Sequence, residues 1–285
     1  MSGLLAQDVV RRAAQLVVEA EALLVTAGAG LGVDSGLPDF RSPRGFWRAY
    51  PPLERLGLSF EDMAQPRWFD TDPALAWAFY GHRLQLYRRT RPHAGYTILK
   101  SWCDRMPAGG FVLTSNVDGQ FFAAGFPKQR VVEQHGSIHR LQCTAPCCEE
   151  TWPAPPHDLD IDMASFRAVG ELPRCGRCGA LARPNILMFA DDRWIPNVTR
   201  AQRERFIAWL EAVRGRRVLI VECGAGTAVA AIRYAGERIA EQLGATLVRI
   251  NPEAGMEPDG VVPVPLGALE ALRRIERAMR ETARA

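Results

Sequence analysis

The sequence predicts an α/β protein: a doubly wound, Rossmann-like parallel sheet joined to a second, smaller lobe. Short apolar runs alternate with stretches whose apolar residues recur at helical spacing, which is typical of a parallel sheet covered by helices on both faces. Two segments, residues 42–91 and 143–182, break this alternation. The first is rich in Trp, Phe and Pro, and the second is rich in Cys. We therefore expect residues 1–41, 92–142 and 183–285 to form the sheet domain, and the two insertions to form the smaller lobe.

The chain of 285 residues is long enough to bury a full hydrophobic core. Its 35 basic and 32 acidic residues give a net charge of +3, which is too balanced to indicate nucleic acid or an anionic membrane as a partner. No apolar run approaches the roughly 18 residues of a membrane span. The first residues also lack the basic-then-apolar pattern of a signal peptide. We therefore expect a cytoplasmic protein, and the composition leaves its oligomeric state open.

The first expected helix spans residues 6–21, and it leads into a strand at 23–26 that is followed by closely spaced glycines. Gly28 and Gly30 flank Ala29 where this strand ends. Glycines at a strand-to-helix turn let the backbone approach a phosphate, and a helix N-terminus there favours negative charge. The spacing differs from the G-x-G-x-x-G dinucleotide motif, so a purely structural turn is the alternative.

Within the first insertion, Asp72 and Pro73 form a typical helix start, and we expect this helix to continue through Tyr87. Tyr80 and Arg83 are three residues apart on it, so they share one face. A guanidinium beside a phenol can bind a carboxylate through two hydrogen bonds. The alternative, and the commoner state of such a pair, is a solvated arginine next to a half-buried ring.

Polar side chains follow two predicted strands at the point where each strand ends. Ser115, Asn116 and Asp118 come after the strand at 111–114, and His135 comes after the strand at 131–133. Ligand groups of α/β folds lie at the carboxyl ends of parallel strands. The ordinary pKa of an imidazole is roughly 6.5, which suits proton transfer at neutral pH. An Asx turn after the first strand and a structural role for the histidine are the alternatives.

The second insertion holds five of the seven cysteines, namely Cys143, Cys147, Cys148, Cys175 and Cys178. The last two form a clean C-x-x-C pair, and two such pairs are typical of a structural zinc site with four thiolate ligands. Either Cys147 or Cys148 completes the first pair, and Pro146 favours Cys147 because it would help to fix a turn. Unligated thiols, or another metal such as iron, are the alternatives. Between the pairs, residues 152–170 are expected to be loop and a short helix.

The rest of the chain continues the alternation of helices and strands. We expect a helix at 199–213, a strand at 218–221, a last strand at 246–250 and an amphipathic helix at 266–282. Gly224 lies in a second glycine-rich turn, directly after a strand, where the backbone can cradle a phosphate or a ribose. Asn251 follows the last expected strand. From Arg183 onward, the chain is expected to return to the sheet.

Several strings of residues together resemble the signatures of the sirtuins, a family of NAD-dependent protein deacylases, in their bacterial form. Residues 28–41 match G-A-G-x-S-x-x-S-G-[IL]-P-D-F-R except at Gly32. Residues 114–119 match T-Q-N-[IV]-D-G except at Ser115, and His135 begins the family's H-G pair. Residues 184–191 resemble P-x-[VIL]-[VIL]-x-F-G-E, with Ala190 and Asp191 in place of Gly and Glu. The matches extend from residue 24 to residue 253, which is most of the chain.

This resemblance implies a Rossmann-like NAD-binding domain, with a zinc ribbon and a helical insertion in the smaller lobe. It implies one structural zinc ion, held by Cys143, Cys147, Cys175 and Cys178. It places the NAD site at Gly28, Ala29, Gly30, Asp39, Phe40, Arg41, Ser115, Asn116, Asp118, Gly224 and Asn251. Asn116 and Asp118 would hold the nicotinamide and its ribose, and His135 would be the general base. The substrate would be an acylated protein or peptide, whose backbone pairs with the segment that contains Phe189. Nicotinamide and O-acyl-ADP-ribose would be the products.

The resemblance also bears on the acyl group. Tyr80 and Arg83 fall within F-Y-x-x-R, ahead of a Pro-x-Ala-Gly segment. This arrangement resembles the sirtuins that prefer succinyl- or malonyl-lysine. We therefore expect Tyr80, Arg83 and Phe189 to contact the acyl-lysine, and negatively charged acyl chains to be accepted.

Two other functions fit the same motifs. The departures at Ser115, Ala190 and the Gly224 turn leave open a protein ADP-ribosyltransferase or an NAD glycohydrolase, in which a protein nucleophile or water accepts the ADP-ribose. An NAD-binding sensor without catalysis is the third function. The intact polar residues after the two strands argue against it, since a pure binder does not need a general base.

Overall fold

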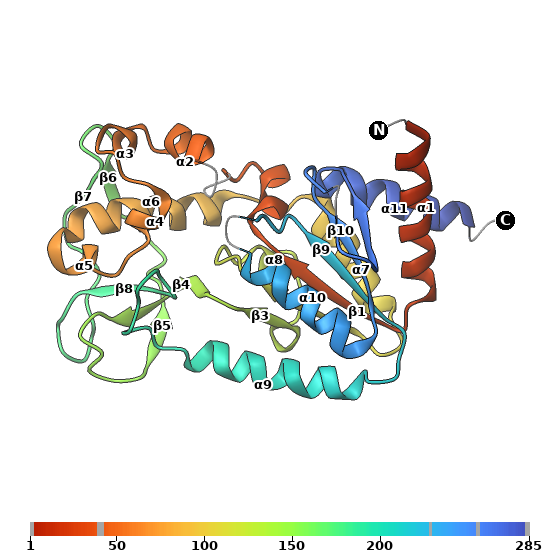
Figure 1. Cartoon of the computed structure of the whole chain (residues 1–285). Coiled ribbons are helices and arrows are strands. Elements are labelled where there is room, and N and C mark those ends of the chain that lie inside the picture. The colour runs from red at the N-terminus through yellow and green to blue at the C-terminus, as the bar shows by residue number, and fades with distance from the viewer. Residues whose placement is uncertain (1–2, 39–42, 228–229, 255–256, 283–285) are drawn as a thin grey trace.

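The computed structural model describes residues 3–38, 43–227, 230–254 and 257–282. Figure 1 shows a large sheet flanked by helices and, beside it, a smaller region of helices and short strands. The six strands of the large sheet are all parallel, in the order β11-β10-β9-β1-β2-β3. The prediction of a doubly wound α/β fold is therefore confirmed.

The strands of the large sheet are β1 (Ala22–Ala27), β2 (Gly110–Thr114), β3 (Val131–Glu133), β9 (Val218–Cys223), β10 (Thr246–Ile250) and β11 (Val261–Val264). Its covering helices are α1 (Gly3–Glu19), α7 (Ala94–Arg105), α9 (Asn197–Ala212), α10 (Ala231–Leu243) and α11 (Ala268–Thr282). Every residue of β1, β2 and β9 is buried, which explains why these strands are nearly continuous apolar runs rather than alternating ones.

The two faces of the sheet bury separate cores. Leu23 of β1 packs on one side with Trp102 and Leu272, under α1, α7 and α11. Leu24 points to the opposite side and packs with Phe111 and Trp209, under α9 and α10. The helices from the two ends of the chain, α1 and α11, lie side by side (Figure 1).

The prediction that residues 246–250 form the last strand of the sheet is wrong, because β11 adds a sixth strand. Its sequence is Val-Val-Pro-Val. Pro263 has no N–H to donate to a ladder, so such a strand is tolerated only at an edge. β11 is the edge strand beside β10, and this tertiary pairing makes it a strand.

The smaller region contains two groups of elements. Residues 43–89 form five helices: α2 (Pro43–Ala49), α3 (Pro51–Arg55), α4 (Phe60–Met63), α5 (Trp68–Thr71) and α6 (Pro73–Arg89). Two small antiparallel sheets follow, made of β5 (Thr151–Pro153), β4 (Gly136–Cys143) and β8 (Ala182–Ile186), and of β6 (Asp160–Asp162) and β7 (Arg167–Val169). α6 runs through the core of this region, where Trp77 and Phe79 pack with Ile138 of β4 and Ile186 of β8.

Two expectations for this region are wrong. Residues 152–170, all of which the structure describes, contain no helix; they form most of β5 and all of β6 and β7. Contacts with α6 decide this, because Leu159 and Ile161 lie directly over Gly81. In addition, the chain does not return to the large sheet at Arg183. It forms β8, which pairs with β4, and it rejoins the large sheet at β9. The predicted domain boundaries stay a prediction.

Three further short elements position the site, namely the 3-10 helices η1 (Ala29–Ser35) and η2 (Lys128–Arg130) and the helix α8 (Gln120–Ala123). Of the helices that the structure describes, none combines the length and the apolar character needed to cross a membrane.

Candidate active site

Two glycine-rich turns lie against each other at the carboxyl ends of the neighbouring strands β1 and β9. The N–H of Gly28 donates to the Cys223 carbonyl at 3.0 Å, and the N–H of Gly30 donates to the Gly224 carbonyl at 3.0 Å. A Cβ on Gly28 would lie 2.6 Å from the Gly224 oxygen, and one on Gly30 would lie 2.8 Å from the Gly224 Cα. Gly224 itself has a φ of 63°. These turns therefore require glycine, and they leave at the strand ends the side-chain-free backbone against which α/β folds bind dinucleotide phosphates.

Asn251 holds the second of these turns in place. It follows β10 directly, and its Nδ2 donates to the Ala225 carbonyl at 2.9 Å. The N–H of Gly224 donates in turn to the Ile250 carbonyl at 3.0 Å. Asn251 thus lies beside Gly224, at the edge of the sheet where the sequence predicts the cofactor.

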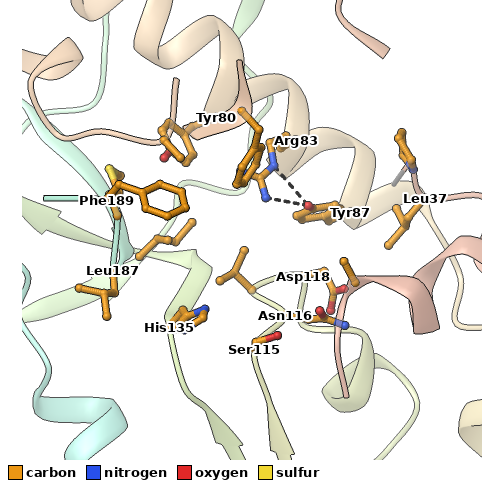
Figure 2. Close-up of a pocket in the computed structure, with 17 residues that line it drawn as sticks. Leu37, Tyr80, Arg83, Tyr87, Ser115, Asn116, Asp118, His135, Leu187 and Phe189 are labelled. Atoms are coloured by element: carbon orange, nitrogen blue, oxygen red, sulfur yellow. Dashed lines mark hydrogen bonds between the residues drawn. The ribbon is translucent and has the colours of Figure 1, made fainter. Parts of the chain in front are cut away.

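A pocket of about 260 Å³ lies between α6 and the ends of β2, β3 and β8 (Figure 2). Distant segments of the chain supply eight of the predicted site residues to its walls: Ala29, Tyr80, Arg83, Ser115, Asn116, Asp118, His135 and Phe189. The glycines and Asn251 are not among the residues that line it. Asp39, Phe40 and Arg41 fall outside the described residues.

Asn116 connects the loop after β2 to the turn after β1. Its Nδ2 donates to the Gly28 carbonyl at 3.0 Å, and its backbone N–H donates to the Thr114 hydroxyl at 3.0 Å. The neighbouring Ser115 donates its N–H to the Ala27 carbonyl at 3.0 Å. The Asn116 amide is therefore fixed between the glycine turn and the pocket.

Asp118 is a buried carboxylic acid on the same loop. Burial raises its pKa to about 6, against the opposing effects of the Gln120 N–H, which donates to Oδ1 at 2.9 Å, and of the Arg83 charge. The backbone here is held by His139, whose Nε2 lies 2.8 Å from the Asp118 carbonyl oxygen. A group that titrates near neutrality in a ligand pocket is a candidate for a functional role.

His135 follows β3 and forms part of the pocket wall, across from Arg83 and Tyr80 in Figure 2. Its carbonyl accepts the N–H of Leu187 at 2.9 Å, which ties the β3–β4 link to the segment after β8. The imidazole therefore lies in the same pocket as the Asn116 and Asp118 side chains, as expected for residues at neighbouring strand ends.

The opposite wall is one face of α6, which begins with the predicted Asp72 cap: Oδ1 accepts the Leu75 N–H at 3.2 Å. Arg83 is 6% exposed and donates from Nε and Nη2 to the Tyr87 hydroxyl, at 3.2 and 3.0 Å. Its guanidinium carbon lies 5.7 Å from the ring centre of Tyr80 and 5.1 Å from that of Phe79. Burial opposes its ionisation, but the neighbouring tyrosines keep the pKa of Arg83 above its ordinary value. The pocket wall thus carries a fixed, buried positive charge.

Phe189 lies at the exposed side of the pocket, with 39% of its surface accessible. It follows β8, and its N–H donates to the Ala64 carbonyl at 2.8 Å. The next residue, Ala190, is exposed and has a φ of 52°, where the sirtuin pattern has glycine. The side chain of Asp191 is buried and forms two hydrogen bonds with Arg183, at 2.8 and 2.9 Å. These two departures from the pattern therefore act on the backbone after β8, and neither side chain is among those that line the pocket.

Four cysteines gather in the smaller region, and they are the four that the sequence favours: Cys143, Cys147, Cys175 and Cys178. Their sulfur atoms all lie within 4.8 Å of one another. The Sγ atoms of Cys143 and Cys178 are 3.6 Å apart, and those of Cys147 and Cys175 are 3.7 Å apart. Tetrahedral Zn–S bonds of about 2.3 Å place the sulfurs about 3.8 Å from one another, so the cluster fits one structural zinc ion.

Two residues that shape the pocket, Tyr87 and Phe60, are not among the site residues that the sequence predicts. Tyr87 lies four residues after Arg83, so helical spacing alone would have placed both on one face. Phe60 comes from α4, and its ring lies 5.5 Å from the Arg83 guanidinium. No local pattern identifies Phe60, because the packing of α4 against α6 brings it to the pocket.

The chain matches the family model described as "Sir2 family" over residues 28–207. A protein of Aeropyrum pernix named NAD-dependent protein deacylase is 30% identical over 279 residues, which cover 95% of this chain and 98% of that protein. One of Pyrobaculum aerophilum, named NAD-dependent protein deacylase 2, is 32% identical over 252 residues, or 88% and 86% of the two chains. A solved Sir2 homologue in complex with NAD has a TM-score of 0.70 at 23% identity, over 95% of this chain and 94% of that one, and is similar in fold.

Proposed function

Since this chain belongs to the Sir2 family and is an NAD-dependent protein deacylase, we propose that its pocket binds the acyl-lysine of a protein or peptide and accepts acyl chains that end in a carboxylate. NAD supplies the nicotinamide–ribose bond that the reaction breaks.

The glycine turns bind the phosphates of NAD, and Asn251 binds its adenosine ribose. Asn116 and Asp118 hold the nicotinamide and its ribose. The packing of Gly28 against Gly224 supports the first assignment, because it removes side chains from the strand ends. The hydrogen bond from Asn116 to Gly28 supports the second, because it joins the nicotinamide residues to the phosphate turn.

His135 acts as the general base. Its imidazole would take the proton of a ribose hydroxyl, so that the ribose oxygen can bond to the acyl carbon. The bond from that carbon to the lysine nitrogen would then break, and the lysine would leave as an amine that takes up a proton. Asp118 shares the pocket and has a pKa raised to about 6 by burial, so it is largely ionised at neutral pH and can accept a hydrogen bond from a hydroxyl. The aromatic and aliphatic side chains around the pocket exclude competing water.

The buried guanidinium of Arg83 is the observation that carries the proposal on the acyl group. A carboxylate that reaches it receives charge-assisted hydrogen bonds in a site with little water. The Tyr87 hydroxyl orients the guanidinium, so little side-chain freedom is lost on binding. An acetyl group has no carboxylate, so the Arg83 charge does not strengthen its binding.

The substrate peptide pairs with residues 187–189. The N–H groups of these residues are already engaged, with the carbonyls of His135 and Ala64 and with the Asp191 carboxylate. The peptide therefore donates its own N–H groups to the carbonyls of this segment. Leu187 and Phe189, which are 37% and 39% exposed, contact its side chains.

NAD turnover with acetyl-lysine and succinyl-lysine peptides tests these assignments, with wild type beside His135→Ala. We expect nicotinamide release that needs both the peptide and His135, and O-acyl-ADP-ribose as the product by mass spectrometry. Faster turnover of the succinyl peptide supports the role of Arg83. Nicotinamide release without any acyl peptide would instead support the NAD glycohydrolase, and ADP-ribose attached to protein would support the transferase.

A further inference from the structure

The 3-10 helix η1 joins the first glycine turn to the pocket of Figure 2. Its first residue, Ala29, and Leu37, which follows its end, both line that pocket. Leu31 within it is fully buried and lies against the second glycine turn, because a Cβ on Gly224 would lie 2.1 Å from the Leu31 nitrogen. The position of η1 therefore determines how the two glycine turns and the pocket meet.

His93, directly before α7, contacts η1 at two points. Its Nε2 lies 2.8 Å from the Leu31 carbonyl oxygen, and its backbone N–H donates to the Ser35 hydroxyl at 3.0 Å. Leu31 is the third residue of η1 and Ser35 is its last. On another side, Asp34 accepts the N–H of Leu269, at the start of α11, at 2.8 Å. Among these contacts, the one from the imidazole is made to the residue that lies against the second glycine turn.

The other ring nitrogen of His93 is engaged as well. Nδ1 accepts the Gly95 N–H at 2.9 Å, which caps the first turn of α7. A backbone N–H can only donate, so Nδ1 carries no proton, and Nε2 carries the proton that it donates to Leu31. Burial lowers the pKa of His93 below its ordinary 6.5, which favours this neutral form at neutral pH.

The packing around the imidazole holds it in this orientation. A Cβ on Gly95 would lie 2.5 Å from Cε1 of the ring, so the ring fills the space that a side chain at that position would take. The ring of Tyr96 has its centre 5.0 Å from that of His93. The imidazole therefore has little freedom to move away from Leu31.

We propose that His93 is a positioning residue for NAD. By holding the Leu31 carbonyl, it keeps the two glycine turns at the separation that the phosphates of NAD require; this rests on the assignment of the phosphates to those turns. Without the bond, part of the binding free energy of NAD is spent on ordering η1, so the affinity falls. His93 is not among the residues that line the pocket, so its loss affects NAD binding rather than the bond-breaking step.

Two amide substitutions separate the functions of the two ring nitrogens. Asparagine presents an acceptor near the place of Nδ1, so His93→Asn keeps the cap of α7 and loses the bond to Leu31. Glutamine presents a donor near the place of Nε2, so His93→Gln keeps the bond to Leu31 and loses the cap. Each variant loses one hydrogen bond, so both should melt about 2 °C below wild type.

Calorimetric titration of the full chain with NAD, without peptide, tests the proposal. We expect His93→Asn to bind NAD about fivefold more weakly than wild type, which is the effect of one hydrogen bond, and His93→Gln to stay within about twofold. In turnover, His93→Asn should raise KM for NAD about fivefold and leave kcat within about twofold. His157→Asn, at an exposed histidine of the smaller region, is the control and should change neither quantity.

Wild-type affinity in His93→Asn, or equal weakening in both amide variants, would overturn the proposal, because a purely structural role makes NAD affinity follow stability. Gly224→Ala shows which assignment has failed. If Gly224→Ala loses NAD binding while His93→Asn keeps it, the glycine turns still bind the phosphates and only the role of His93 is wrong. If both variants bind NAD as wild type does, the assignment of the phosphates to the glycine turns fails as well.

Discussion

The guanidinium of Arg83 and the hydroxyl of Tyr87, one helical turn apart on α6, are joined by two hydrogen bonds of 3.2 and 3.0 Å. The spacing in the sequence predicts a pair of Arg83 with Tyr80 instead. Tyr80 does line the same pocket, but its hydroxyl has no hydrogen-bond partner among the described residues, and its ring lies beside the guanidinium. The orientation of the charge in the pocket therefore depends on Tyr87.

Arg83→Met should separate the two acyl activities. We expect kcat/KM for a succinyl-lysine peptide to fall about 100-fold, the effect of losing a charge-assisted pair, while that for an acetyl-lysine peptide stays within about threefold. Tyr87→Phe keeps the Arg83 charge but removes the hydroxyl that orients it. It should therefore lower kcat/KM for the succinyl-lysine peptide by less than Arg83→Met does. Arg89→Met, on an exposed part of the same helix, is the control and should change neither activity. Equal loss of both activities in Arg83→Met would contradict the proposal that Arg83 binds the carboxylate of the acyl chain.

Asp118→Asn should stabilise the protein and inactivate it. In the folded state burial raises the Asp118 pKa from its ordinary 3.8 to about 6, so stability falls as the pH rises from 3.8 to about 6 and stays lower above that. This rise in the Asp118 pKa corresponds to a loss of roughly 3 kcal/mol in the free energy of unfolding above pH 6. The neutral amide that replaces the carboxyl group in the variant does not ionise, so the variant avoids this loss. Urea unfolding at pH 8 should therefore show the variant as the more stable protein, with the gap closing towards pH 4. A less stable variant at pH 8 would show that the carboxylate is held by favourable contacts.

Gly224→Ala and Gly226→Ala form a matched test of the cofactor turns. A Cβ at Gly224 would lie 2.1 Å from the Leu31 nitrogen, at a φ of 63°, whereas a Cβ at Gly226 has no atom within 4 Å. We expect Gly224→Ala to lower the melting temperature and to abolish the NAD-dependent rise in that temperature. Gly226→Ala should behave as wild type in both respects. Normal NAD binding by Gly224→Ala would contradict the proposal that the glycine turns bind the phosphates of NAD.

Metal analysis of two single variants distinguishes the neighbouring cysteines. Cys147 lies in the four-sulfur cluster, and the Sγ of Cys148 is 3.9 Å from that of Cys147. Cys148→Ala should keep about one zinc per chain, and Cys147→Ala should lose it together with much of the thermal stability, because structural zinc contributes directly to folding. Zinc retained by Cys147→Ala and lost by Cys148→Ala would reverse the assignment.

Ala190→Gly should stabilise the chain. A φ of 52° is strained for alanine, by about 1 kcal/mol, and glycine adopts it freely. The melting temperature should rise by about 2 °C. Ala208→Gly, in the middle of α9, should lower it by a similar amount, because glycine is unfavourable inside a helix. A fall in both variants would mean that the Ala190 methyl makes contacts that outweigh the strain.

The sequence by itself determined most of the large sheet and many of the residues that meet in the pocket. Buried parallel strands need continuous apolar runs, so β1, β2 and β9 are visible as such. The polar residues after these strands could be assigned to one edge of the sheet, since parallel strands end on the same side. The pair of Cys175 and Cys178 was equally clear, because tetrahedral thiolate ligation needs cysteines at short spacing, whereas the first pair left Cys147 and Cys148 open.

Only the tertiary structure decided those features that depend on contacts between distant segments of the chain. β11 is a strand because β10 is beside it, and β6 and β7 form because residues 159–161 pack over Gly81. The same holds for Phe60, which reaches Arg83 through the packing of one helix on another. Periodicity and motif spacing report local and same-edge relationships, whereas the enclosure of a cavity is a property of the packed chain.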